Sequence, residues 1–356
     1  MVRRKREKVK NKKKIIFNAV FLLVVFGLTL YGVFHGENLG ELWKAIHGTD
    51  FRWLLPGIIC VVIFIWGESI IIWYMMRSYG IHLKKWTCFL FSNVGFFFSC
   101  ITPSASGGQP MQIYYMKKEK ISIPVSTVIL MIVTITYKLV LVVIGVGILI
   151  FGQGFLHQYL EGILPVYYLG LALNVFCVCF MMILVFHPLL AKTLMTKGLL
   201  LLERMHILKH KEGRTRKLED SMDIYNQTAA YLKSHIFVIV NVFLITFAQR
   251  VVLFASTWFV YRAFHLSEAS AITVILLQAV ISVSVDMLPL PGGMGISETL
   301  FLKIFQPIFG KLLLPAMILS RGLAYYVQLL VSALLTGVAQ LTIGQKKFRL
   351  KEEHDY

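Results

Sequence analysis

Charged side chains stand inside apolar segments of the sequence, where a bilayer makes them costly. Glu68 and Arg250 lie in the middle of two apolar runs, and Lys138 and Arg321 lie in two others. Ionised groups at membrane depth normally face the interior of a helix bundle and pair with one another. Glu68 could pair with Arg250 or with Arg321, and the sequence does not decide between them. Such a pair could bind a substrate or could serve only to orient helices.

Two further carboxylates, Asp286 and Glu298, flank a stretch rich in glycine and proline. Three cations and three carboxylates would then lie at similar depth. We expect a cavity in which the cations Lys138, Arg250 and Arg321 meet a phosphate. The carboxylates of Glu68, Asp286 and Glu298 would meet a cationic or polar group.

Two stretches of the chain, 102–110 and 289–298, cannot continue a helix. Proline lacks an N–H group, and glycine tolerates the positive φ that other residues avoid. In a bilayer, broken backbone persists only where it is buried in protein or lines a wet cavity. Helix N-termini at these breaks would also offer N–H donors to a phosphate. The expected site residues in the two breaks are Ser104, Gly107, Gly108, Gln109, Gly292 and Gly293.

The composition predicts the elements that hold these residues in place. The chain has 356 residues, of which 57% are hydrophobic, and several apolar runs reach the length of about 20 residues that crosses a bilayer. This predicts an all-α polytopic membrane protein with about six full spans. The expected spans are 15–34, 53–76, 122–150, 165–186, 234–261 and 313–343.

Each break lies between two short apolar segments. The chain before the first segment and the chain after the second are expected on the same face of the membrane. We therefore expect two re-entrant helical hairpins, one entering from each face of the membrane. Two short full spans in place of the first hairpin are the alternative.

The net charge of +18 is distributed in the way that membrane topology predicts. Of the 36 Lys and Arg residues, 28 fall in segments that we place in the cytoplasm, where cationic loops are retained. This places both termini, 1–14 and 344–356, in the cytoplasm and excludes nucleic acid as the partner. The basic segment 1–14 is expected to contact anionic lipids, and 188–233 reads as an amphipathic cytoplasmic connector.

The segment order suggests an internal repeat within the transmembrane region 15–343. Residues 53–150 and 234–343 each contain a span, a broken hairpin and a long span, and they start on opposite sides. Glu68 and Arg250 are 182 residues apart, close to the 183 between Lys138 and Arg321. Paired breaks in inverted halves indicate a transport site near the midplane. Chance spacing among similar apolar segments is the alternative.

Motifs for soluble catalysis are not found in the sequence. It contains no phosphate-binding loop, no metalloprotease motif and no His/Cys cluster at metal-ligand spacing. We therefore expect no metal site, no cofactor and no catalytic residues, and whether the chain is an enzyme stays open.

Two stretches carry a family resemblance. Thr102-Pro-Ser-Ala-Ser-Gly-Gly-Gln-Pro-Met-Gln-Ile-Tyr-Tyr-Met116 and Leu290-Pro-Gly-Gly-Met-Gly-Ile-Ser-Glu298 resemble the signature stretches of the lysylphosphatidylglycerol synthase/flippase membrane region. The resemblance implies a membrane domain that moves aminoacylated phosphatidylglycerol between leaflets and lowers sensitivity to cationic peptides. Full-length members carry a cytoplasmic aminoacyltransferase domain after the membrane region. No such domain is found in this sequence, so the resemblance is to stand-alone members of the family. Many relatives have an acidic residue after the two glycines of the first stretch, where this chain has Gln109.

The leading hypothesis is a lipid translocase whose substrate is a phospholipid, with the glycine-rich turns as floor and gate. The alternatives are an accessory scaffold for a lipid-synthesis enzyme and a component of a phosphatidylglycerol lysyltransferase. A homo-oligomer is also compatible with the sequence. The headgroup, the direction and the driving force are not given by the sequence.

Overall fold

The computed structural model describes residues 39–102, 105–187, 190–197, 214–288, 293 and 295–344. The expected first span, the basic segment before it and the tail from residue 345 lie outside these ranges. The chain divides into two units, Met1–Thr49 and Asp50–Tyr356. In the first unit, α2 (Leu39–His47) is the described helix, and the ring of Trp43 packs 4.3 Å from that of His47. Everything that follows concerns the second unit.

The described residues contain helices and no strand, which confirms the all-α class. Five helical runs are long and apolar enough to cross a membrane, and they correspond to five of the six expected spans. They are α3 (Phe51–Ser78), α6 (Ile123–Phe151), α8 (Leu164–Phe186, preceded by the 3₁₀ turn η2, Glu161–Ile163), α11 (Ile236–Ala263), and the consecutive α15 (Leu313–Arg321), η5 (Gly322–Val327) and α16 (Gln328–Thr342).

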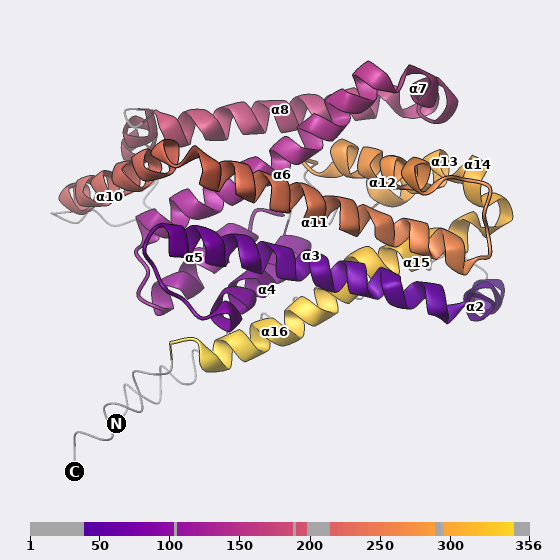
Figure 1. The fold of residues 1–356 in the computed structure, drawn as a ribbon, viewed down its shortest axis with the longest axis horizontal. Helices are drawn as coiled ribbons and strands as arrows, with labels where there is room; N and C mark the ends of the chain where they lie inside the picture. The colour runs from indigo at the N-terminus through magenta and orange to yellow at the C-terminus, as the bar shows by residue number, and fades with distance from the viewer. Residues whose placement is uncertain are drawn as a thin grey trace, which may run out of the picture. The chain divides into compact units, whose positions relative to one another are not determined.

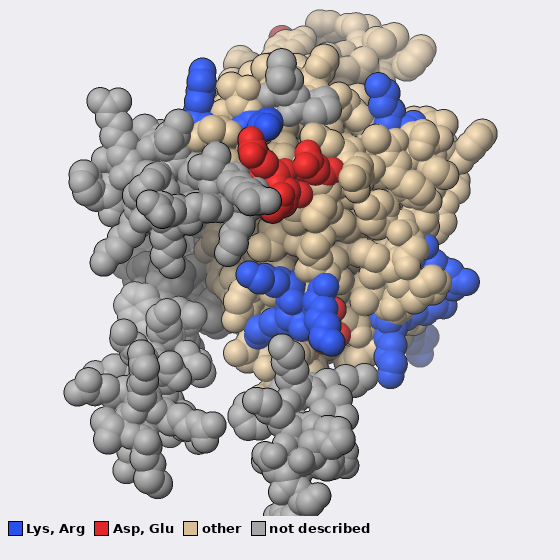
Figure 2. Space-filling model, turned by 90° about the vertical axis from the view of Figure 1, so that its left-hand side faces the viewer, with Lys and Arg blue, Asp and Glu red and all other residues tan. Residues whose placement is uncertain are grey.

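One end of this unit, called the basic end, carries the cations that flank the long helices. The C-terminal ends of α3 and α10 (Arg214–Ser234) meet there, where the Tyr231 hydroxyl donates to the Ser78 carbonyl at 2.5 Å. The ends of α5 (Gly108–Lys118) and α16 also meet there, with Tyr115 Oη 2.7 Å from Gln340 Oε1. Figure 2 shows Lys and Arg side chains at several places on this face, with a group of carboxylates between them.

The first broken segment forms a hairpin of α4 (Lys85–Ile101) and α5 that both enters and leaves at the basic end. The α4 helix begins shortly after α3 ends, and Lys118 at the end of α5 donates to Gln340 of α16 at 3.2 Å. At 17 and 11 residues, these helices are shorter than the five spans.

The second broken segment forms a hairpin at the opposite end. It consists of α12 (Ala271–Val285) and α13 (Ile296–Ile304), followed by α14 (Gln306–Phe309) and η4 (Gly310–Leu312). The N–H of Ala269 donates to the Tyr261 hydroxyl near the end of α11 at 2.8 Å. The ring of Phe309 lies 5.6 Å from that of Tyr261, so both ends of the hairpin lie beside the end of α11.

The two halves pack across each other. Helices α3 and α11 lie side by side and run antiparallel, since the N–H of Asp50 before α3 donates to the carbonyl of Ala263 at the end of α11 at 2.9 Å (Figure 1). The α4 helix packs against α16 of the second half, and α12 packs against α6 and α8 of the first half. The packing has the crossed form that an inverted repeat requires; the repeat boundaries remain a prediction.

The outward faces of the long helices remain apolar. On α3, large exposed side chains recur every three or four residues: Leu55, Ile59, Ile63, Trp66 and Ile70. Helical residues at this spacing lie on one face. An apolar exposed stripe of this kind suits contact with lipid tails.

Three local features differ from the expected outline. The loop expected at 151–164 contains a short helix, α7 (Gln153–Tyr159). The connector contains α10 and a helical stretch at 190–197, and its residues 198–213 lie outside the described chain. The last span is interrupted by η5, a π-helical turn. Turns of this type appear mostly as single bulges in helices and are frequent at functional sites.

Candidate functional site

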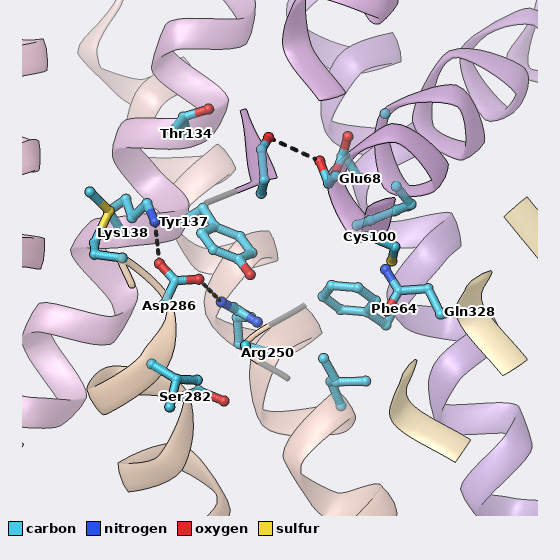
Figure 3. A pocket seen from close by; sticks show the side chains of 18 of the residues that line it. Phe64, Glu68, Cys100, Thr134, Tyr137, Lys138, Arg250, Ser282, Asp286 and Gln328 are labelled. Atoms are coloured by element: carbon cyan, nitrogen blue, oxygen red, sulfur yellow. Dashed lines mark hydrogen bonds and ion pairs between the residues drawn. The ribbon is translucent and has the colours of Figure 1, made fainter. Parts of the chain in front are cut away.

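A cavity of about 450 Å³ lies where the tips of the two hairpins meet the long helices (Figure 3). Its wall includes residues of α3, α4, α5, α6, α8, α11, α12 and η5, so both halves contribute. Seven of the twelve expected site residues line it: Glu68, Gln109, Lys138, Arg250, Asp286, Gly293 and Arg321. The charges that the sequence placed at membrane depth are therefore brought together around one space.

Asp286, at the end of α12, is the carboxylate shared by two cations. Its Oδ2 contacts the ammonium of Lys138 on α6, and its Oδ1 lies 3.8 Å from Nη2 of Arg250 on α11 (Figure 3). The three residues come from three different helices, and Lys138 is 148 residues from Asp286 in sequence. Asp286 thus joins α6 and α11 to the tip of the second hairpin.

Arg250 is the most deeply buried of these cations, with a side chain that is 4% exposed. Its guanidinium carbon lies 3.5 Å from the ring centroid of Tyr137, so a cation–π contact holds it in place. Its Nε and Nη2 have no hydrogen-bond partner among the described residues. Buried donors without acceptors are costly. Arg250 therefore offers donors that an acceptor entering the cavity could satisfy.

Glu298 and Arg321 form the second ion pair. Arg321 Nε donates to Glu298 Oε1 at 2.8 Å, and the N–H of Gly295 donates to Glu298 Oε2 at 2.6 Å. Glu298 is not among the residues that line the cavity, whereas Arg321 is. Glu298 therefore caps α13 and pairs with Arg321 from outside the cavity wall. This position differs from the expectation that its carboxylate meets a cationic headgroup.

Glu68 of α3 accepts a hydrogen bond from Gln112 of α5 at 2.8 Å. The described chain shows no ion pair to Glu68, because Arg250 and Arg321 approach Asp286 and Glu298 instead. Neither of the two pairs expected for Glu68 is formed. The contact with Gln112 depends on Gly95 of α4, where an added Cβ would lie 3.0 Å from Gln112 Cγ and closer to its amide.

The glycines of the first hairpin permit close packing and do not line the cavity. The N–H of Gly107 donates to Thr102 Oγ1 at 2.8 Å, and a Cβ added at Gly108 would lie 2.7 Å from the carbonyl of Gly95. Gln109, one residue further on, lines the cavity and donates to the Thr134 hydroxyl.

The second hairpin uses glycine in another way. Gly293 lines the cavity and has φ of 66°, the conformation that glycine tolerates. The N–H of Gly295 before α13 and that of Gly107 before α5 both have acceptors within the chain. These two donors are therefore already occupied, and the phosphate contacts expected at the breaks stay a prediction. Ser104 and Gly292 lie outside the described residues.

The sequence reading did not include several polar or aromatic residues of the wall. Gln112 and Tyr137 are the most informative, since Gln112 contacts Glu68 and Tyr137 contacts Arg250. Gln112 stands within the first signature stretch, and Tyr137 directly precedes Lys138. Their closeness in sequence to predicted site residues could therefore have indicated them. The described part of the chain has no group of three His, Cys, Asp or Glu residues that could hold a metal ion.

Comparison with known families identifies the region. The family model described as "Lysylphosphatidylglycerol synthase TM region" matches residues 15–332. The chain belongs to this family. The match covers both hairpins and the cavity, and it confirms the family suggested by the two signature stretches. With the five apolar helical runs, it makes this a multi-pass membrane protein whose function is connected with membrane lipids.

A curated relative gives a partial match. The "Uncharacterized protein MG306 homolog" of Mycoplasma pneumoniae (strain ATCC 29342 / M129 / Subtype 1) is 26% identical over 113 residues. This stretch is 30% of the present chain and 29% of that protein, so the match spans less than a third of the relative.

Proposed function

We propose that the protein is a lipid translocase of the bacterial cell membrane, which moves the headgroup of a phospholipid between leaflets through the cavity. The observation that carries the proposal is the position of this cavity between two broken hairpins that enter from opposite ends of the helix bundle. Discontinuous helices in inverted halves are a common design of midplane transport sites. Aminoacylated phosphatidylglycerol is the substrate to which the family name points.

A phospholipid presents two different parts to such a protein. Its headgroup loses hydration when it leaves the surface, and the buried Arg250 and the Glu68 carboxylate would replace part of that hydration. Its tails need no polar path, and exposed apolar stripes such as that of α3 would let them stay in the lipid phase. The proposed orientation places the basic end in the cytoplasm, following the distribution of Lys and Arg. Contacts of the segment 1–14 with anionic lipids, and of the connector with a lipid-synthesis enzyme, are further proposals.

Reconstitution tests the proposal. Phospholipids with a fluorescent label on one acyl chain are placed in proteoliposomes with the purified chain, and a membrane-impermeant quencher reports the fraction in the outer leaflet over time. We expect faster exchange than in empty vesicles. Arg250→Gln should slow it by about 10-fold or more, which corresponds to about 1.4 kcal/mol, because the cavity loses its unsatisfied donors.

The matched control is Arg52→Gln, since Arg52 is an exposed arginine at the beginning of α3, away from the cavity wall. It should exchange lipid at the unaltered rate. Absence of protein-dependent exchange for phosphatidylglycerol, its lysyl ester and phosphatidylethanolamine alike would refute the proposal.

A further inference from the structure

The ion pairs around the cavity leave one carboxylate and one cation available. Lys138 makes the close contact with Asp286, which Arg250 approaches only at 3.8 Å, and Arg321 is held by Glu298. Glu68 and Arg250 are the two of these six charges without a close ion pair among the described residues. Given the proposed translocase, we infer that the cavity selects a net-neutral headgroup with one phosphate and one ammonium, the phosphate on Arg250 and the ammonium on Glu68.

The anionic half rests on the unsatisfied nitrogens of Arg250. Its contact with Asp286 is long, at 3.8 Å, whereas Asp286 makes a close contact with Lys138. Arginine presents a planar fork of donors that matches the oxygen atoms of a phosphate. A phosphate could take Nε and Nη2 while Lys138 retains Asp286, so no carboxylate would be left alone.

The cationic half rests on Glu68. One of its oxygen atoms accepts from Gln112, and among described residues the carboxylate has no cation within ion-pair distance. An ammonium has three donors and no acceptor. It would give this carboxylate the counter-charge that its neighbours do not supply.

Phe64 links the two halves. It lies one helical turn before Glu68 on α3, so the two side chains share a face. Its ring centroid is 5.9 Å from the guanidinium carbon of Arg250. Phe64, Glu68 and Arg250 all line the cavity, and Phe64 lies near Arg250 in the view of Figure 3. A single small headgroup could therefore contact the cation and the carboxylate at the same time.

The same arrangement disfavours other headgroups. A phosphate without an ammonium, as in phosphatidylglycerol, would bring a negative charge toward the Glu68 carboxylate, which makes no ion pair within the described part of the chain. A headgroup with two ammonium groups, as in the lysyl ester, would bring two cations to one available carboxylate. Discrimination by unpaired buried charge is a common source of specificity.

Binding is tested with the purified full chain in detergent micelles. Thermal unfolding is followed while dihexanoyl phosphatidylethanolamine, dihexanoyl phosphatidylglycerol or free glycerophosphoethanolamine, a net-neutral phosphodiester, is added, because a ligand of the folded state raises the melting temperature with concentration. We expect the ethanolamine lipid to bind about 10-fold more tightly than the glycerol lipid. A shift with free glycerophosphoethanolamine as well would show that the headgroup alone suffices; a shift with the lipid alone would show that its tails contribute. Either result supports the assignment.

Two variants locate the selectivity. Glu68→Gln keeps the shape of the side chain and should abolish the preference, whereas Glu68→Asp keeps the charge and should retain it. Glu268→Gln makes the same chemical change at an exposed residue outside the cavity wall and should leave the preference intact. Equal binding of both lipids by the unaltered protein, or an unchanged preference in Glu68→Gln, would overturn the inference.

Exchange measured with acyl-labelled versions of the two lipids separates this inference from the proposed function. Equal exchange of both lipids, together with equal binding, would leave the translocase standing and remove the selectivity. Selective binding that depends on Glu68 without exchange of any lipid would remove the translocase and leave the headgroup site.

Discussion

At the scale of single residues, the Glu298–Arg321 pair is predicted to serve stability. Both side chains are largely buried, at 14% and 16% exposed, and both Glu298 oxygens accept hydrogen bonds. Glu298→Gln would remove the carboxylate that pairs with the Arg321 guanidinium in a poorly solvated place. Glu298→Gln should therefore lower the free energy of unfolding by about 3 kcal/mol, measured by unfolding in mixed detergent micelles.

Glu219→Gln is the matched control for this change. Glu219 pairs with Lys192 at 3.2 Å on the surface, and the side chains are 53% and 49% exposed. Exposed pairs contribute little, so the change should stay within about 0.5 kcal/mol. Adding Arg321→Gln to Glu298→Gln should recover part of the loss, because the guanidinium that lost its carboxylate is then removed as well. Equal losses in the two single variants would contradict a special role for the buried pair.

At the scale of helices and hairpins, the sequence predicted what depends on local chemistry. Apolar runs predicted the five described spans to within a few residues, and the glycine- and proline-rich stretches predicted the two hairpin turns. The ion pairs were not predictable, because Lys138 and Asp286 are 148 residues apart and every cation had several carboxylates to choose from. The π-helical turn was missed for a related reason. Its Tyr325 hydroxyl donates to the Cys100 carbonyl of α4 at 2.9 Å, a contact between distant helices.

The contact between α8 and α12 gives a prediction at this scale. A Cβ added at Gly170 would lie 2.5 Å from Ser284 Cα and from the Val283 carbonyl oxygen. Close approach of this kind between membrane helices needs a small residue. Gly170→Ala should therefore cost about 1–3 kcal/mol, as overpacking does, and should move Asp286, two residues beyond Ser284. Unfolding and lipid exchange would both report the change.

Gly147→Ala provides the comparison. Gly147 lies in α6 and has open space where a Cβ would point. Alanine is a better helix former than glycine by up to about 1 kcal/mol, so this variant should be as stable as the unaltered protein or slightly more so. Similar destabilisation by both alanines would show that the α8–α12 approach is not the cause.

At the scale of the whole molecule, the cavity lies between two hairpins whose ends lie at opposite ends of the helix bundle. Both ends of the α4–α5 hairpin lie at the basic end of the bundle. Both ends of the α12–α13 hairpin lie at the opposite end. The tips then meet between the long helices and supply Gln109, Asp286 and Gly293 to one space. If either hairpin crossed the membrane as two full spans, its ends and its tip would lie on opposite sides.

Single cysteines placed at the flanks of each hairpin test this topology. Suitable exposed positions are Lys85 and Lys117 for the first hairpin, and Glu268 and Lys311 for the second. The background should lack Cys177 and Cys179, the two native cysteines that are not buried. In intact cells, a membrane-impermeant thiol reagent should label Glu268→Cys and Lys311→Cys, and it should reach Lys85→Cys and Lys117→Cys after permeabilisation. Labelling of Lys85→Cys and Lys117→Cys from opposite sides would show that the α4–α5 segment crosses the membrane an odd number of times and is not a hairpin, and the cavity could not then be formed between opposed tips.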